Sequence, residues 1–241
     1  MTQSAKKTII LFALVTGGAA ALAAAFVLPL FFPAAVKAQA APTVIAAWKT
    51  DSYVPASFPG KALPSKDSVV TATVEILDGG RFADLSGTEI RWLLDNDEFV
   101  SGFGKKTFQF RVGKEAESVH ELKITVLYRD AELINFLMIP VAAPEVAIDF
   151  KMYHYQIKRG ESRLKAVPYF FNIADPKKDL DYVWSSGNQA TEEADADPDE
   201  LIYEVSPETP IGDIINISVL ARNIQKELEL AGDSLTLVVI K

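Results

Sequence analysis

The stretch Val69–Leu77, with the sequence VVTATVEIL, decides the fold of this chain. Its even-numbered residues are all apolar, whereas the residues between them are Thr71, Thr73 and Glu75, as expected for a strand with one buried face. The same period of two continues through most of the sequence after Ala41. Clusters of glycine, proline and aspartate separate the strand candidates, which recur roughly every 10–18 residues. We therefore predict an all-β fold, and the strand spacing favours a β-sandwich.

The chain after Ala41 repeats its own pattern. Ile90-Arg91-Trp92 matches Tyr182-Val183-Trp184 at a spacing of 92 residues. Three later strand segments match at spacings of 93, 93 and 98: Phe108–Val112 with Leu201–Val205, Leu122–Arg129 with Ile215–Arg222, and Leu137–Val141 with Leu235–Val239. Each unit opens on an Ala-Pro dipeptide, at Ala41 and at Ala143. We predict a duplicated domain, with one sandwich over residues 41–142 and a second over residues 143–241.

Trp92 and Trp184 hold the same place in the two units, in the third predicted strand. A tryptophan that faces inward from this strand fills the centre of an immunoglobulin-like sandwich. Because the chain has no cysteine, the disulfide of antibody domains is missing, and the units resemble the disulfide-free immunoglobulin-like and PKD-like repeats of bacteria. The Gly-Asp-Gly turn common in PKD repeats is absent, since Trp184 is followed by Ser185-Ser186-Gly187.

The connection Ser52–Pro64, between the first two predicted strands, has a distinctive sequence. It contains Tyr53, Pro55 and the run Gly60-Lys61-Ala62-Leu63-Pro64. In this it resembles a stretch at the start of exported immunoglobulin-like proteins of candidate-phylum bacteria. The resemblance implies an exported location and an immunoglobulin-like fold, but no particular activity. Its three prolines also predict an extended, turn-rich segment that cannot pair along its whole length.

The first forty residues predict a hydrophobic helix at the amino terminus. Thr8–Val36 carries no charged side chain, and about twenty helical residues suffice to cross a bilayer. A membrane anchor is one interpretation; the other is a signal peptide cleaved after Ala40, because Ala38-Gln39-Ala40 has the small-x-small form of a cleavage site. Lys6 and Lys7 keep the short leading segment in the cytoplasm. Both interpretations place the rest of the chain outside the cytoplasmic membrane, either anchored or secreted.

Charge and cysteine content narrow the partners and the compartment. The chain has 24 Lys plus Arg and 32 Asp plus Glu; since Lys6, Lys7 and Lys37 precede the sandwiches, the exported part carries about −11 charges. Such a surface repels nucleic-acid phosphates, so no nucleic-acid partner is expected. An exported chain without cysteine must be held together by hydrophobic burial alone. This combination is typical of a bacterial cell envelope.

Residues suited to catalysis are scarce. His120 and His154 are the only histidines, and a zinc-protease motif that began at His120 would need histidine where Ile124 stands. No Gly-x-Ser-x-Gly elbow occurs. Both histidines are interpreted as surface or cross-strand residues. We therefore predict no catalytic residue, no cofactor and no enzymatic activity.

One acidic segment suggests a metal site. Asp195, Asp197 and Asp199 alternate within Glu192–Glu200, so an extended backbone would direct their carboxylates to one side. Calcium prefers six to eight oxygen ligands, and carboxylates supply them. The alternative is a solvated acidic loop, because the glycine-centred spacing of a dedicated calcium loop is missing. Calcium at these three residues is thus one prediction for this chain.

Three aromatic residues form a candidate contact surface. Trp48, Tyr53 and Phe58 lie in or beside the proline-rich connection, where exposed rings could anchor a protein or sugar partner. They could equally fold back over the open end of the first sandwich. The sequence as a whole predicts a non-catalytic envelope protein for adhesion or assembly, with protein partners and, if the first helix is retained, the membrane. The alternative is an accessory module that binds sugar or peptide outside the cytoplasm.

Overall fold

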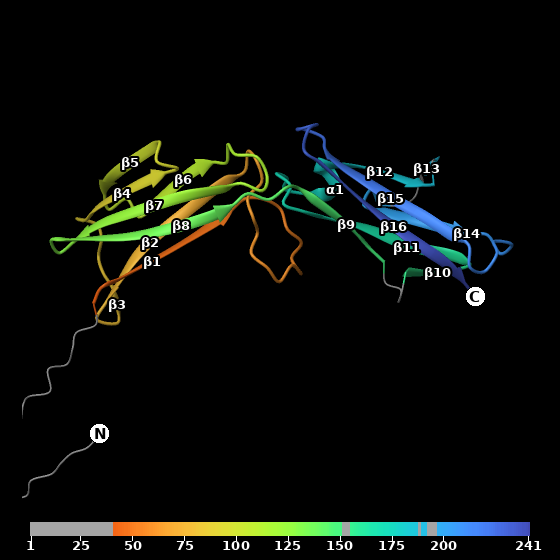
Figure 1. Ribbon diagram of the computed structural model, residues 1–241, viewed down its shortest axis with the longest axis horizontal. Coiled ribbons are helices and arrows are strands. Elements are labelled where there is room, and N and C mark those ends of the chain that lie inside the picture. Colours follow the sequence, from red (N-terminus) through yellow and green to blue (C-terminus); the bar gives the residue numbers. More distant parts are fainter. Residues whose placement is uncertain (1–40, 151–154, 188, 192–196) are drawn as a thin grey trace, which may run out of the picture. The chain divides into compact units, whose positions relative to one another are not determined.

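The computed structural model describes residues 41–150, 155–187, 189–191 and 197–241 (Figure 1). Ala40–Lys241 forms one compact unit. The predicted amino-terminal helix, signal or anchor, falls on residues 1–40 and lies outside the described residues. Within the described ranges, no helix is both long enough and apolar enough to cross a membrane. The fold there is all-β apart from the short helix α1, Pro176–Asp179, which is capped by the Asp175 side chain.

The first sandwich consists of two antiparallel sheets. One holds β1, β2, β3 and β6, and the other has the order β5-β4-β7-β8. The strands are β1 Thr43–Thr50, β2 Val69–Asp78, β3 Arg81–Phe82, β4 Glu89–Leu94, β5 Glu98–Phe103, β6 Thr107–Arg111, β7 Val119–Tyr128 and β8 Ala131–Pro140. The predicted strand Val69–Leu77 is confirmed as β2, with Val70, Ala72, Val74 and Ile76 buried.

The second sandwich repeats this plan. One sheet has the order β14-β11-β9 and the other the order β10-β16-β15-β12-β13. The strands are β9 Glu145–Asp149, β10 Gln156–Lys158, β11 Gly160–Tyr169, β12 Leu180–Ser186, β13 Gln189–Thr191, β14 Glu200–Val205, β15 Ile214–Asn223 and β16 Leu230–Ile240. In both units the first, second and fifth main strands form one sheet, and the third, sixth and seventh lie in the other. This is the strand order of an immunoglobulin-like sandwich, as predicted.

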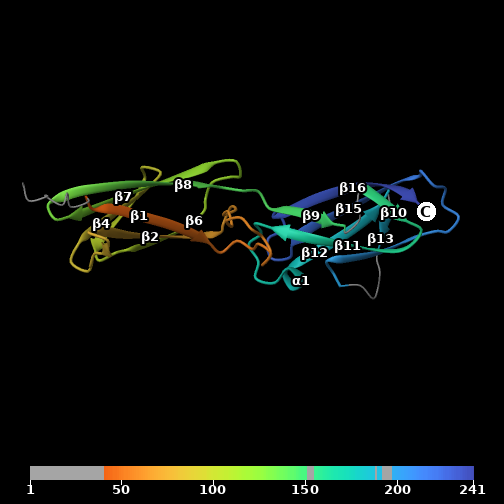
Figure 2. The same cartoon turned by 90° about the horizontal axis from the view of Figure 1, so that it is seen from below.

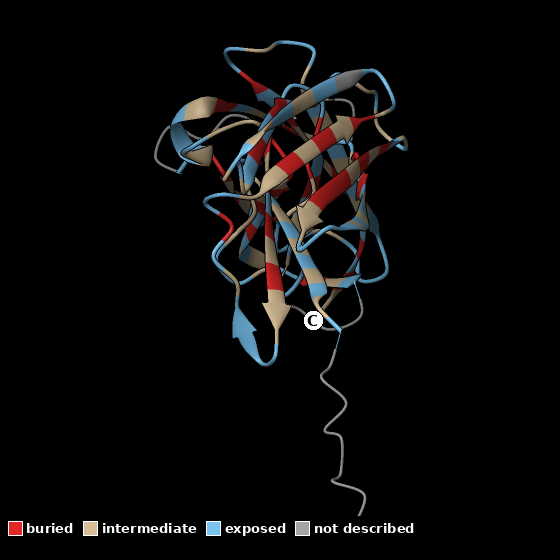
Figure 3. Ribbon diagram, turned by 90° about the vertical axis from the view of Figure 1, so that its left-hand side faces the viewer, coloured by how far each residue is buried: buried red, intermediate tan, exposed pale blue. Residues whose placement is uncertain are grey.

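Each sandwich has its own hydrophobic core. The first core runs in sequence from Val70 to Val141 and the second from Val146 to Val239. Buried residues alternate with half-buried or exposed ones along the strands, which Figure 3 shows as red bands between tan and pale blue ones. At about 1.5–3 kcal/mol for each large apolar side chain buried, these two clusters supply the main stabilisation of a chain without disulfides.

The two predicted core tryptophans differ in their hydrogen bonding. Trp92 is fully buried, stacks on Phe108 with ring centroids 5.8 Å apart, and donates from Nε1 to the Lys105 carbonyl at 2.9 Å. Trp184 is 5% exposed, and its buried Nε1 has no partner among the described residues. Both rings therefore fill the cores as expected, but only the first also bonds to the chain that crosses to the opposite sheet.

The register of the strands corrects one part of the repeat. Trp92 pairs with Ile124 on β7, whereas Trp184 pairs with Val219 on β15. Val219 lies 95 positions after Ile124, so the sixth strands match at 95 and not at 93. The sequence comparison was wrong here by two residues, because a shift of two along a strand keeps every side chain on the same face.

The two sandwiches differ at one edge of the sheet. In the second, β10 pairs in parallel with the end of β16, from Gln156 with Val238 to Lys158 with Ile240 (Figure 2). In the first, the described residues at the matching place contribute one main-chain bond, from the Ala142 N–H to the Pro64 carbonyl at 2.8 Å. In the first sandwich, the segment that would have to form a counterpart of β10 is the end of the proline-rich connection. Only Pro64 of this connection bonds to the chain that follows β8.

Candidate functional site

The connection Ser52–Pro64 joins the first sandwich to the second through the main chain. The Tyr53 N–H donates to the Phe171 carbonyl at 2.7 Å, and the Phe170 N–H donates to the Tyr53 carbonyl at 2.7 Å. Together they form a single antiparallel bridge between residues 118 positions apart. The prolines around Tyr53 hold this segment extended, so its backbone donor and acceptor are free to reach the neighbouring domain.

Aromatic rings pack on either side of this bridge. The Phe58 ring lies 5.6 Å from the Tyr169 ring and 5.9 Å from the Phe170 ring, the latter in an edge-to-face arrangement. Such pairs stabilise by about 0.5–1.5 kcal/mol beyond the area that they bury. Burial and then the charge of Asp199 raise the pKa of the Tyr53 hydroxyl. The Phe58 ring thus makes a contact within the chain, and Tyr53 contributes its main chain to the same contact.

A polar cluster completes the junction. The Asn172 amide Nδ2 donates to Ser65 Oγ at 3.1 Å, to the Lys66 carbonyl at 2.8 Å and to Glu229 Oε1 at 2.6 Å. The Asn172 main-chain N–H also donates to Glu229 Oε1 at 2.8 Å, and Asn223 Nδ2 donates to Oε2 at 2.5 Å. Asn223 is 1% exposed. The Glu229 carboxylate therefore fixes the position of Asn172. The Asn172 side chain then hydrogen-bonds to Ser65 and Lys66 of the first sandwich.

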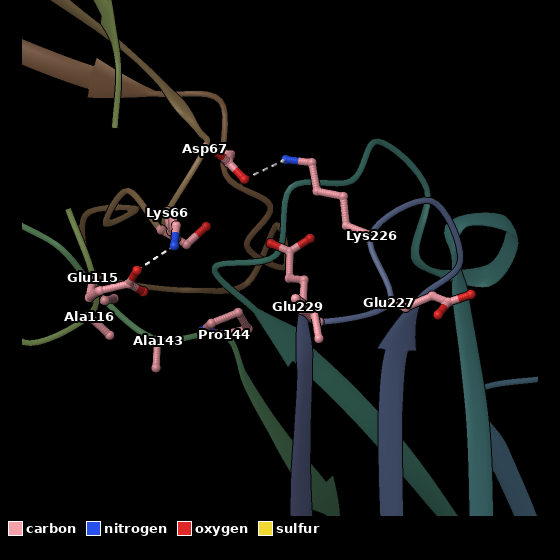
Figure 4. Close-up of a pocket in the computed structure, with 12 residues that line it drawn as sticks. Lys66, Asp67, Glu115, Ala116, Ala143, Pro144, Lys226, Glu227 and Glu229 are labelled. Carbon is pink, nitrogen blue, oxygen red and sulfur yellow. Dashed lines mark hydrogen bonds and ion pairs between the residues drawn. The ribbon is translucent and has the colours of Figure 1, made fainter. Parts of the chain in front are cut away.

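A cleft of about 510 Å³ opens beside these contacts (Figure 4). Lys66 pairs with Glu115 on one side, and Lys226 lies 4.0 Å from Asp67 on the other. The remaining lining residues are small or acidic: Ser65, Ala116, Ala142, Ala143, Pro144, Glu227 and Glu229, with Leu228 at 98% exposure. No aromatic side chain lines the cleft, and each lysine already has a carboxylate partner. Most of its exposed lining is apolar, and among the described lining residues there is no nucleophile with an adjacent base.

The three predicted calcium ligands are only partly described. Asp195 lies outside the described residues. Asp197 is exposed and 2.5 Å from Lys177 Nζ, whose hydrogen bond lowers the pKa of Asp197. Asp199 is 4% exposed and lies 3.3 Å from Lys165 Nζ and 3.7 Å from Lys177 Nζ. Across the described part of the chain, no group of three or more histidine, aspartate or glutamate side chains could hold a metal ion. Calcium binding here stays a prediction.

The structure separates Trp48 from Tyr53 and Phe58. Trp48 lies on β1, half-buried against the first core, and Lys61 Nζ stands 3.2 Å above the centre of its ring. Burial lowers the pKa of Lys61. Of the three predicted contact residues, Trp48 thus packs within the first sandwich, while Tyr53 and Phe58 lie at the junction.

Sequence reasoning missed several residues of the junction and one of the first sandwich. Asn172, Asn223 and Glu229 have no motif, and Asn172 contacts residues more than 100 positions away. The available signal was that the second unit has no counterpart of Ser52–Pro64. Of the two interpretations of His120, the structure rules out the surface position: His120 lies on β7 opposite Ile139 of β8, is only 4% exposed, and has Nδ1 2.5 Å from Asp95 Oδ2. His154 lies outside the described residues.

Comparisons with known proteins concern the fold. No protein-family model matches the sequence, and no curated protein matches it. Among solved structures, the chain is similar to three N-terminal domains of the highly immunogenic outer capsid protein of bacteriophage RB49, with 14% identity and a TM-score of 0.42 over 83% of this chain and 59% of that chain. A chimeric titin Z1Z2 is 12% identical, with a TM-score of 0.34 over 84% of this chain and 97% of that chain.

The D1–D4 ectodomain fragment of ICAM-5 is 9% identical, with a TM-score of 0.28 over 80% of this chain and 53% of that chain. The chain spans less than two thirds of the phage structure and of the ICAM-5 structure. At these identities and TM-scores the comparisons carry no argument about this chain, and the tandem immunoglobulin-like fold rests on the strand order of its two pairs of sheets.

Proposed function

We propose that this chain is a non-catalytic module of the bacterial cell envelope, with a structural role in adhesion or assembly. The observation that carries the proposal is the junction: Tyr53, Phe58 and Asn172 bond the first sandwich to the second. The Phe58 ring and the Tyr53 main chain, which could have contacted a ligand, instead contact the second domain. A pair of domains bonded in this way suits a protein that spaces or presents a surface.

The location belongs to the same proposal. The uncharged run Thr8–Val36 supports export, with the sandwiches anchored outside the cytoplasmic membrane or secreted after cleavage near Ala40. The net charge of about −11 on the exported part opposes nucleic-acid binding. No sequence motif for catalysis contradicts a structural role.

The proposal is tested by cross-linking the full chain in its native envelope and recovering it under denaturing conditions. We expect a protein partner at a fixed stoichiometry, and we expect it to persist after a high-salt wash. Recovery of the chain on glycan resin, with no protein attached in the envelope, would reject the structural role.

A second candidate is the capture of a sugar or peptide, favoured by the cleft of about 510 Å³, a volume in the range of ligand sites. Its lining is mostly apolar, and the charged side chains of Lys66 and Glu115 beside it would orient a ligand. Titration calorimetry with oligosaccharides and peptides on the wild type and on Lys66→Ala separates the two functions. Ligand capture predicts saturable heat that the variant loses, whereas a structural module predicts none from either protein.

A further inference from the structure

The two sandwiches differ in what covers the same end of the domain. Thr43 and Glu145, the corresponding first residues of β1 and β9, pair with Leu77 and Tyr169, which lie 92 positions apart. At this spacing the turn after β2 corresponds to Phe170–Asn172. In the second sandwich these residues bond to the first sandwich. Within the described part of the chain, the corresponding end of the first sandwich carries no such cover.

We call this corresponding end, formed by residues 78–84 and 128–131, the leading end. It lies where the described chain begins, at β3 (Figure 1). The Gly79-Gly80 pair, with φ of 58° and 80°, turns the chain back beside β2. Phe82 is 67% exposed, and its neighbour Arg81 is exposed and belongs to none of the ion pairs among the described residues. The leading end therefore offers an aromatic ring and a guanidinium that the domain itself does not use.

Charge alone does not select a partner for the leading end. Asp78 pairs with Arg129 at 2.6 Å inside it. Arg81 and Asp130 then balance, and Asp84 leaves a formal charge of about −1, against about −11 for residues 41–241. A surface of low net charge is therefore not repelled. The exposed aromatic ring is the main feature available for contact.

The position of the leading end along the chain does select a partner. The uncharged run Thr8–Val36 is separated from Thr43 by residues 37–42 alone, which span at most roughly 20 Å. Thr43, Leu77 and Phe82 form one row across β1, β2 and β3. Because neighbouring strands are about 4.8 Å apart, Phe82 lies roughly 10 Å from Thr43. A bilayer that holds the uncharged run is thus within reach of Phe82.

We propose that the leading end rests on the outer surface of the membrane that anchors the chain, with the Phe82 ring in the lipid headgroup layer. The inference rests on the anchored form of the proposed location. Aromatic rings are favoured in this layer, and the Arg81 guanidinium can donate to lipid phosphates while its methylene groups follow the apolar boundary. The same end of both domains then contacts whatever precedes it, the bilayer in one case and the first sandwich in the other.

The experiment uses the full chain in phosphatidylcholine vesicles and exploits its lack of cysteine. A fluorophore is attached at Asp84→Cys, an exposed position two residues after Phe82, and quenching by a nitroxide on the lipid headgroup is measured. The matched control is Asp97→Cys, an exposed aspartate in the β4–β5 turn. It lies at the far end of the ten-residue strand β7, roughly 30 Å from the leading end.

We expect quenching at Asp84→Cys to exceed that at Asp97→Cys about threefold, because only the first label lies at the lipid surface. Adding Phe82→Ala should reduce the quenching at Asp84→Cys to about the level of the control. Urea unfolding of the variant should be unchanged, since Phe82 is mostly exposed in the fold. In native membranes, a photo-cross-linker at Asp84→Cys should yield a lipid adduct.

Three results would overturn the inference. Equally weak quenching at Asp84→Cys and Asp97→Cys would show that the leading end stands off the bilayer. Quenching that Phe82→Ala leaves unchanged would mean that the short tether alone brings the label near lipid. A photo-adduct with protein, whether a second copy or another chain, would replace the lipid by that partner.

The anchored location is checked separately by alkaline carbonate extraction of native membranes. Retention of the full chain together with weak quenching would reject the lipid contact and leave the anchored location standing. Release of a product that begins at Ala41 would remove both, while the adhesion or assembly role would still be decided by the native-envelope cross-linking.

Discussion

At the scale of single residues, the Asp95 carboxylate holds a network of hydrogen bonds in the first sandwich. It accepts hydrogen bonds from Lys114 Nζ at 2.8 Å and from the Glu121 N–H at 2.9 Å, and His120 Nδ1 lies at 2.5 Å. Burial works against its ionisation, but these donors outweigh burial and lower the pKa of Asp95. Charged hydrogen bonds of this kind tie the β4–β5 turn to β7.

A pH dependence follows for Asp95. A carboxylate whose pKa is lowered by folding contributes stability above its unfolded pKa of about 3.9, and that stability is lost as the pH falls through the folded pKa. We therefore expect the wild type to lose more free energy of unfolding than Asp95→Asn between about pH 5 and pH 2. Urea titrations at a series of pH values measure this difference. Asparagine tolerates the positive φ of 51° at this position, so the variant tests the charge. Parallel pH curves would contradict the assignment.

At the scale of elements, the connection Ser52–Pro64 does the work that a regular strand does in the second sandwich. There, β10 pairs with the edge of β16. In the first sandwich, the connection makes only one such main-chain bond, at Pro64. It contacts the second domain through Tyr53 and Phe58. One local difference between two copies of a fold thus produces a junction.

Phe58→Ala tests the role of the connection. We expect a loss of about 1–3 kcal/mol in the free energy of unfolding, because the ring packs on Tyr169 and Phe170. Phe82→Ala is the matched control: Phe82 is 67% exposed on β3, so its removal should change stability by less than about 0.5 kcal/mol. Chemical unfolding followed by fluorescence measures both. If both variants are equally stable, Phe58 is a free surface residue and the partner-site hypothesis for it gains support.

At the scale of the whole molecule, the hydrogen bonds of Asn172 couple two domains that have separate cores. Domains with separate cores unfold together only if the contacts between them are strong enough. The Asn172 side chain bonds to Ser65 and Lys66 of the first sandwich and to Glu229 of the second. Removing it takes a donor away from Ser65 Oγ and from the Lys66 carbonyl, whereas Glu229 Oε1 keeps the Asn172 main-chain N–H.

We expect scanning calorimetry of Asn172→Ala to show two unfolding transitions where the wild type shows one. The cost to the less stable domain should be about 1–3 kcal/mol, the usual effect of leaving buried polar groups unpaired. Asn216→Ala is the control, because Asn216 lies on an exposed position of β15 and its side chain bonds only to Thr236 among the described residues. An unsplit transition in both variants would show that the domains are coupled by other contacts.

The repeat and the core were predictable because they rest on local patterns. Alternation along Val69–Leu77 marks a buried face, and the matched tryptophans Trp92 and Trp184 mark the same strand twice. The register of the sixth strand was not predictable, because Leu122–Arg129 matches equally well two residues along when only the face is preserved. Asn172 and Glu229 could not be found for a similar reason, since an ordinary asparagine and glutamate gain their roles only from neighbours distant in the chain.

The sequence by itself determined the fold class, the duplication and the strands that face the two cores, because these depend on the period of apolar residues within short segments. Only the tertiary structure decided what the proline-rich connection does and which surface is left apolar. The sequence around Tyr53 and Phe58 fits a partner-binding site as well as a cover for the first sandwich. The positions of Phe171 and Tyr169 show that both residues contact the second domain instead. From the sequence alone, Phe136 and Met138 could be core residues. The structure shows that the opposite side of β8 faces the core, so these two side chains are exposed.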